Sequence, residues 1–116
     1  MRFMAALALV VALGAPRTAA AEQTTATSSI AQIMVLESGS KNYKLFHGAI
    51  WLEYDKSKYN YRWGGLHCKN RELSESSVQL LFASFRSEYS VTVEYELTEY
   101  KEKQYRCITG LTVSKN

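Results

Sequence analysis

The sequence predicts a mainly β (α+β) domain with five strands and one α-helix between strands 3 and 4. Two segments of the 116-residue chain, 91–97 and 107–113, alternate apolar and polar residues as half-buried strands do. Between positions 78 and 89, apolar residues recur at helical spacing. An apolar N-terminal run and two cysteines further on are typical of an exported, disulfide-bonded protein.

The first 21 residues have the organisation of a signal peptide. Arg2 is followed by an apolar run from Met4 to Leu13, a break at Gly14-Ala15-Pro16 and small residues over 18–21. We expect residues 1–21 to be removed by cleavage near Ala21–Glu22. The apolar run is too short to span a bilayer comfortably, so we expect no stable membrane anchor after cleavage. The alternative is an uncleaved N-terminal anchor.

Removal of residues 1–21 would leave 95 residues with 12 basic and 11 acidic side chains, a net charge of about +1. This balance excludes the basic footprint of a nucleic-acid-binding protein.

In an exported chain, two cysteines predict one disulfide, Cys68–Cys107. A zinc site would need more Cys or His residues at short spacing than His67 and Cys68 provide, so we expect no metal or other cofactor.

The N-terminal half of the exported chain predicts three strands. Residues 22–29 are rich in Thr, Ser and Ala and predict a flexible leader. Residues 30–36 form a first apolar strand, which ends at the turn-forming cluster 37–42. Residues 43–54 and 59–63 predict two more strands joined by a four-residue turn at 55–58. Gly64-Gly65 should end the third strand.

The turn at 55–58 predicts the pairing of these two strands. Tyr54 would face Tyr59, Leu52 would face Tyr61, and Ile50 would face Trp63, all inward. The outward face would pair Trp51 with Arg62 and Glu53 with Asn60. Arg62 could then stack over the Trp51 ring. We therefore propose these four outward residues as a ligand-binding patch. The alternative is that the helix, the leader or a neighbouring subunit covers Trp51.

The helix is predicted over 75–89. Its apolar side would carry Val78, Leu81, Phe82, Phe85 and Tyr89, with Phe82 and Phe85 packed in the core. Ser74 or Ser76 could cap its first turn, and Ser76 with Gln79 has the spacing of a capping box.

The last two strands predict a hairpin that turns at 101–103. Leu97 would face Cys107, Tyr95 would face Thr109, Val93 would face Leu111, and Val91 would face Val113. Cys107 would then lie on the inner face, and Ile108 would be an apolar exception on the outer face.

Five strands with a helix between the third and fourth have the layout of an OB-fold barrel. A strongly curved, open antiparallel sheet with the helix across one face is the alternative. The barrel is favoured because closure leaves fewer exposed strand edges. No internal repeat is visible, so we expect residues 30–116 to form a single OB-like β-barrel domain.

The chain also resembles small exported OB-fold proteins akin to the binding subunits of pertussis-like and subtilase-type toxins. The resemblance lies in the signal peptide, the segment Trp63-Gly64-Gly65-Leu66-His67-Cys68 and the helix with Val78, Leu80, Leu81 and Ala83. It continues through 91–95 and 106–111. It covers much of the exported chain as a pattern, not as a string of identities. The resemblance implies a ring-forming, glycan-binding subunit without catalytic activity.

The functional expectation is therefore a secreted or periplasmic binding protein. Neither His47 nor His67 belongs to a recognisable nucleophile or metal motif, so we expect no enzymatic activity. After residue 21 the chain has two Trp, eight Tyr and three Phe residues, which suit sugar rings and protein interfaces alike. One hypothesis is a glycan-binding, toxin-type subunit; the other is a protein-interaction factor such as an inhibitor or assembly component. Exposed strand edges also favour a homo-oligomer.

Overall fold

The computed structural model describes residues 22–115, and the expected signal peptide lies outside this range. Strands dominate the described chain, with one α-helix and two short 3-10 helices. The elements are β1 (Gln23–Thr24), β2 (Ser28–Val35), β3 (Gly48–Leu52), η1 (Glu53–Asp55), β4 (Asn60–Trp63), η2 (Leu66–Cys68), α2 (Glu75–Ser87), β5 (Ser90–Tyr100) and β6 (Lys103–Ser114).

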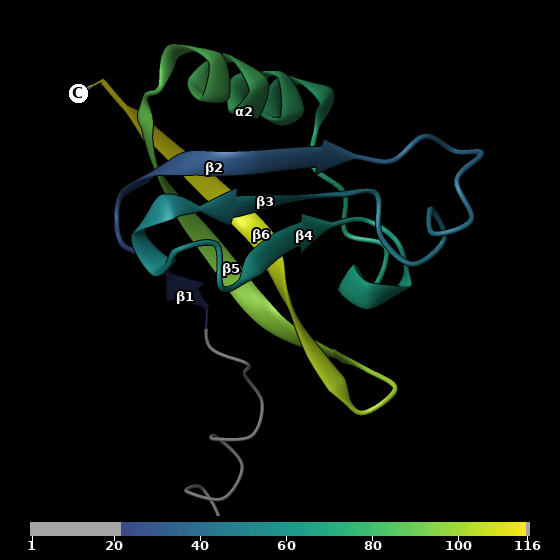
Figure 1. The fold of residues 1–116 in the computed structure, drawn as a ribbon. Coiled ribbons are helices and arrows are strands. Elements are labelled where there is room, and N and C mark those ends of the chain that lie inside the picture. The colour runs from purple at the N-terminus through teal and green to yellow at the C-terminus, as the bar shows by residue number, and fades with distance from the viewer. Residues whose placement is uncertain (1–21, 116) are drawn as a thin grey trace, which may run out of the picture.

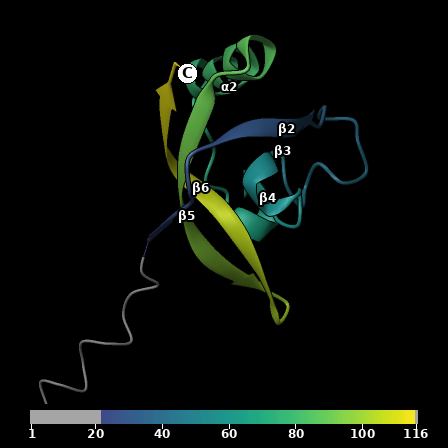
Figure 2. The same ribbon diagram turned by 60° about the vertical axis from the view of Figure 1, so that its left-hand side comes forward.

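Strand pairing closes a ring. The sheet order is β1-β5-β2-β3-β4-β6, and β5 also pairs with β6. The strands β5, β2, β3, β4 and β6 therefore form a closed ring, and β1 pairs with β5 as an additional strand. All pairs are antiparallel except β4 with β6, which are parallel. The helix α2 lies along β2, while the β5–β6 hairpin reaches past the other strands on the opposite side (Figure 1; Figure 2).

The beginning of the chain differs from the prediction. The helix follows the fourth strand, not the third, because the additional strand β1 pairs with β5. Residues 22–29, expected as a flexible leader, contain β1 and the start of β2. Thr25 is buried in this segment, its N–H donates to Val93 O and its Oγ1 accepts from Val93 N. Backbone pairing holds this polar segment, which apolar periodicity could not reveal.

The β3–β4 hairpin has a different register from the predicted one. Gly48 faces Trp63, Ile50 faces Tyr61 and Trp51 faces Asn60, a shift of two residues. The cause is η1, which ends β3 at Leu52 where we expected the strand to continue. A shift of two leaves each side chain on its predicted face. Tyr54 is the exception: it lies outside the strand and is 47% exposed.

The β5–β6 hairpin follows the predicted register over only half its length. Val91 faces Val113 and Val93 faces Leu111 as expected, but the register shifts between Glu94 and Tyr95. Beyond this bulge Tyr95 faces Ile108 and Glu96 faces Cys107. The extra residue, Thr109, lies in β6, so the two faces of β6 are exchanged beyond the bulge whereas β5 keeps its alternation. Ile108 therefore points into the core, and Cys107 points away from it.

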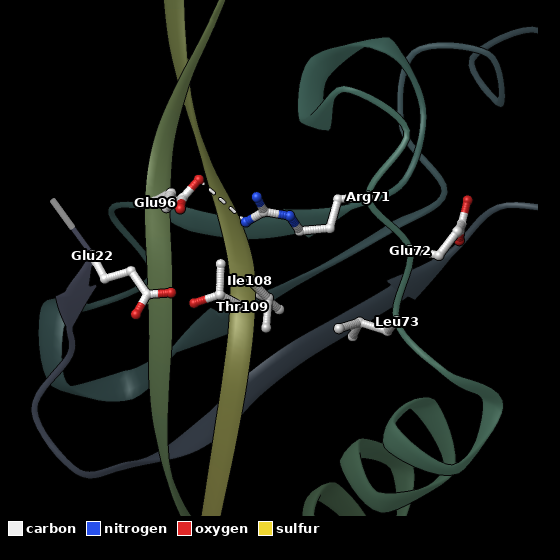
Figure 3. Close-up of a pocket in the computed structure, with 7 residues that line it drawn as sticks. All are labelled: Glu22, Arg71, Glu72, Leu73, Glu96, Ile108 and Thr109. Atoms are coloured by element: carbon white, nitrogen blue, oxygen red, sulfur yellow. Dashed lines mark ion pairs between the residues drawn. The ribbon is translucent and has the colours of Figure 1, made fainter. Parts of the chain in front are cut away.

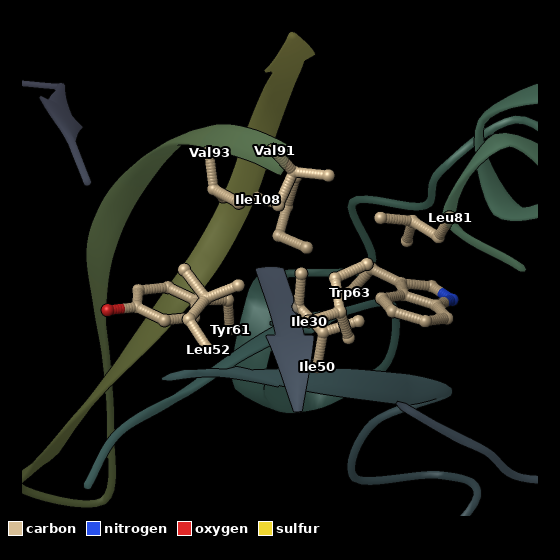
Figure 4. Close-up of a cluster of buried hydrophobic side chains, with 9 residues drawn as sticks. All are labelled: Ile30, Ile50, Leu52, Tyr61, Trp63, Leu81, Val91, Val93 and Ile108. Carbon is tan, nitrogen blue, oxygen red and sulfur yellow. The ribbon is translucent and has the colours of Figure 1, made fainter. Parts of the chain in front are cut away.

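The core fills the inside of the ring. Its buried residues come from five strands and the helix, and Figure 4 shows them converging between these elements. They are Ile30, Ile50, Leu52, Tyr61, Trp63, Leu81, Val91, Val93 and Ile108. The Trp63 ring lies so close to Gly48 that a Cβ there would meet it at 2.2 Å. Only glycine fits this position of β3.

Helix α2 covers the core with Leu81, and Val78, partly buried, packs beside it. Ser74 is the N-cap, and its side chain accepts a hydrogen bond from Ser77 N at 3.1 Å. Leu81 is fully buried, but the expectation for Phe85 was wrong: it is 39% exposed. Ser84 is buried instead, and its hydroxyl donates to Leu80 O. The buried side of the helix is therefore rotated from the predicted one, so that Ser84 and not Phe85 faces inward.

The predicted disulfide is present, on the opposite face from the one expected. Cys68 and Cys107 are bonded, with their Cα atoms 5.6 Å apart. Because the bulge turns Cys107 outward, the bond joins β6 to η2 outside the ring and does not hold the helix over the core.

Candidate functional site

The candidate site lies on the outer face of β3, β4 and β6. Trp51 faces Asn60 across the β3–β4 hairpin, and Arg62 faces Cys107 across the parallel β4–β6 pair. These residues alternate with the core residues Ile50 and Tyr61, so their side chains point away from the core. The disulfide brings η2 over this face and adds its own side chains to it.

Arg62 is the centre of this surface. Its Nε donates to Asn60 Oδ1 at 2.8 Å, and its Nη1 donates to His67 Nδ1 at 2.6 Å. The guanidinium carbon lies 4.1 Å from the centre of the Phe46 ring and 4.8 Å from that of Tyr105. Both distances are within the range of cation–π attraction. We call Phe46, Asn60, Arg62, His67 and Tyr105 the Arg62 cluster.

His67 is the most buried residue of the cluster. Its ring lies parallel to the Tyr105 ring at 3.8 Å and 4°, and a tilted contact with Tyr100 is 5.3 Å between ring centres. Phe46 is stacked with it at a longer distance of 5.9 Å. Only 6% of His67 is exposed. Aromatic rings therefore surround the histidine and its bond to Arg62.

Backbone geometry explains how η2 reaches this position. Gly65 has φ +71°, a left-handed conformation that glycine adopts readily. A Cβ on Gly65 would lie 2.6 Å from the backbone of Leu45. His67 N donates to Leu45 O, and the next residue, Cys68, is tied to β6. Gly65 and the disulfide thus place His67 against the backbone of Leu45 and against β6.

Burial sets the charge state of the cluster. Burial lowers the pKa of the Arg62 guanidinium, but an arginine in a protein stays protonated. Burial, and then the charge of Arg62, lower the pKa of His67. The imidazole is therefore neutral, and its unprotonated Nδ1 is the acceptor of the bond from Arg62. In the described chain no carboxylate forms an ion pair with Arg62.

The structure brings together three of the four residues that we proposed from the sequence. Trp51, Asn60 and Arg62 share one face, but Glu53 lies in η1 and lines a separate hollow. The stacking of Arg62 on Trp51 was wrong, because the ring contacts of Arg62 are with Phe46 and Tyr105.

Sequence reasoning missed Phe46, His67 and Tyr105. Phe46 was assigned to a long strand, but successive turns from residue 37 delay β3 until Gly48. Tyr105 and Arg62 meet through the parallel pairing of β4 with β6, for which no short-range pattern exists. The one available indication was that His67 precedes a cysteine expected to be bonded.

Two hollows lie away from the Arg62 cluster. The first, of about 360 Å³, is lined by Glu22, Arg71, Glu72, Leu73, Glu96, Ile108 and Thr109. Arg71 reaches across it to Glu96 on β5 at 3.2 Å, as Figure 3 shows. The second, of about 320 Å³, lies beside Phe85 and Ile30.

The charged groups of the first hollow are mostly paired. Glu96 is neutralised by Arg71, and the Glu72 carboxylate lies in contact with His47 Nδ1. Among residues 22–115 no group of His, Cys, Asp or Glu has an arrangement that could hold a metal ion. Over the same range no helix is long and apolar enough to cross a membrane.

The Arg62 cluster has groups that can contact a polar ligand. It offers a positive charge, N–H donors and aromatic rings on a rigid strand face. Within residues 22–115 the side chains of His47 and His67 contact Arg62, Glu72 and aromatic rings. Comparison with protein-family models, with curated proteins and with solved structures found no match to this chain.

Proposed function

We propose that this chain is an exported, non-catalytic binding protein and that its ligand is a glycan. The binding surface is the outer face of β3, β4 and β6, with Trp51 beside the Arg62 cluster. The observation that carries the proposal is Arg62 itself. It is a half-buried cation that contacts two aromatic rings and is bonded only to neutral side chains. Such a group attracts a polar ligand, and the half-buried Trp51 offers a ring on which a sugar can stack.

The same proposal includes the finer description of the fold. We infer that β2 to β6 form an OB-like barrel, and that the chain is related in function to the binding subunits of pertussis-like and subtilase-type toxins. The closed order of strand pairing supports the barrel. The disulfide supports export, because disulfides persist in secreted and periplasmic proteins.

A glycan array probed with the purified exported protein tests the ligand class. We expect binding to a subset of glycans, a loss of about tenfold or more with Trp51→Ala, and no loss with Tyr54→Ala. Tyr54 is a suitable control because it is an exposed aromatic residue outside β3 and β4. If the wild-type protein binds no glycan on the array, the glycan proposal is overturned.

The alternative is a protein-interaction factor, and α2 supplies the observation that favours it. Leu80 and Phe85 are 42% and 39% exposed, and large exposed apolar side chains mark protein contacts. This alternative predicts a stable complex with a protein partner in a pull-down and its loss with Leu80→Ser and Phe85→Ser together.

The same surface could join copies of the chain. Light scattering that shows a monomer at high concentration would contradict the homo-oligomer.

A further inference from the structure

We infer that Arg62 binds a carboxylate group of the ligand. The inference deepens the proposed function, since it gives the glycan a chemical class: a sugar that carries a carboxylate, as a uronic acid does. It rests on three features of Arg62: an unpaired charge, unused donors and a fixed orientation.

The charge of Arg62 has no counter-charge in the described chain. A half-buried cation loses part of its hydration, and an opposite charge offsets that loss better than neutral groups do. Its hydrogen-bond partners, Asn60 and His67, are both neutral. Glu96, on the neighbouring part of the same outer face, is already paired with Arg71. The cluster is therefore short of one negative charge.

The guanidinium also has donors to spare. It carries five N–H groups, of which the bonds to Asn60 and His67 use two. The three others, two on Nη2 and one on Nη1, donate to no other described residue. A planar fork of parallel N–H groups matches the two oxygens of a carboxylate.

The fork is held in place before any ligand arrives. The rings of Phe46 and Tyr105 fix the position of the guanidinium, and the bonds to Asn60 and His67 fix its rotation about the side chain. Ordering a free arginine on binding costs rotamer entropy, and a pre-ordered one avoids that cost. Arg62 thus has the charge, the donors and the rigidity of a carboxylate-binding residue.

Arg106 provides a matched comparison within the same domain. It too is partly buried, and it stacks on the Tyr59 ring at 3.8 Å. It faces Tyr61 across the β4–β6 pair, on the opposite face from Arg62. Replacing either arginine with glutamine removes one positive charge, but only Arg62→Gln removes the proposed site.

The test is a titration of the wild-type protein followed by NMR of the arginine Nε–Hε groups. Sodium glucuronate should shift the Arg62 resonance saturably, while the neutral methyl ester of glucuronate at the same ionic strength should not. We expect Arg62→Gln to weaken binding of glucuronate by about 10- to 100-fold, the range for a hydrogen bond to a charged group. Arg106→Gln should leave it unchanged.

Three results separate this inference from the proposed function. No shift of Arg62 with glucuronate, or equal losses for Arg62→Gln and Arg106→Gln, would overturn the carboxylate site. If the array shows neutral glycans that depend on Trp51 but not on Arg62, the proposed function holds and this inference fails. An equal shift with N-acetyl-aspartate amide and an array without glycan binding would support the carboxylate site and overturn the sugar as its ligand.

Discussion

At the scale of single residues, His67 is the group whose chemistry depends most on folding. In the unfolded chain its pKa would be about 6.5, and in the structure burial and the charge of Arg62 lower that pKa. The native protein therefore binds fewer protons than the unfolded chain as the pH falls through this value. Acid must weaken the fold, because stability rises with pH wherever the unfolded state binds more protons.

We predict that the free energy of unfolding of the wild-type protein decreases as the pH falls below about 6.5. In His67→Phe this part of the decrease should be absent, although the variant loses the bond to Arg62 and is less stable at neutral pH. Urea unfolding measured from pH 8 to pH 5 checks the difference. The control is His47→Gln, which removes the other histidine and its contact with Glu72. If the free energy of unfolding of His67→Phe decreases with falling pH as steeply as that of the wild type, His67 is not the source of the decrease.

At the scale of elements, α2 shows how one position dominates the packing of a helix. Leu81 lies in the core and is fully buried, whereas its neighbour Leu80 is 42% exposed. The two leucines have the same side chain and lie in the same helix. Their substitutions therefore separate core packing from helix propensity.

We predict that Leu81→Ala lowers the free energy of unfolding by about 2–5 kcal/mol, the cost of a cavity in a close-packed core. Leu80→Ala should change it by no more than about 0.5 kcal/mol, as is usual for a surface position. Chemical denaturation of both variants provides the measurement. Similar losses in the two would mean that α2 packs differently on β2.

The β5–β6 hairpin, at the same scale, explains the error in the predicted face of Cys107. Its alternation predicts a continuous ladder, and that ladder is present on the side of Val91 and Val93. The bulge lies where Glu94 faces Gly110, a glycine whose absent Cβ leaves room for the Glu94 carboxylate. A glycine in a strand often marks a bulge, so Gly110 carried an indication of it.

At the scale of the whole molecule, the disulfide joins the fold to the candidate site. The residues it bonds are separated by 39 positions in sequence, and the segment between them contains α2, all of β5 and the start of β6. It also anchors η2, which carries His67. Breaking the bond should therefore affect both the stability of the domain and the position of His67.

We predict that the double substitution Cys68→Ala, Cys107→Ala lowers the free energy of unfolding by about 4 kcal/mol, by the chain-entropy estimate for a loop of this length. It should also broaden or shift the Arg62 side-chain resonance, since His67 would lose its anchor. Calorimetry and NMR on the same sample check the two effects. Leu80→Ala is the control for the resonance. An unchanged melting temperature would mean that native packing alone holds η2 in place.

The sequence alone was enough for features that depend on local patterns. Spacing, capping and cysteine count predicted the helix, with Ser74 as one of two candidate caps, and the register of β5 and β6 at Val91 and Val93. They also predicted the end of β4 at Gly64-Gly65 and the pairing of Cys68 with Cys107. Trp51, Asn60 and Arg62 were placed on one face for the same reason, because alternation along a strand is local.

Only the tertiary structure decided which distant residues meet. The parallel β4–β6 pair, the strand β1, the bulge at Glu94 and the position of η2 bring Phe46, His67 and Tyr105 to Arg62. These contacts join segments far apart in the chain, and their energies depend on how the closed ring packs as a whole. A local pattern determines the face on which a side chain lies, whereas the closure of the ring determines its neighbours.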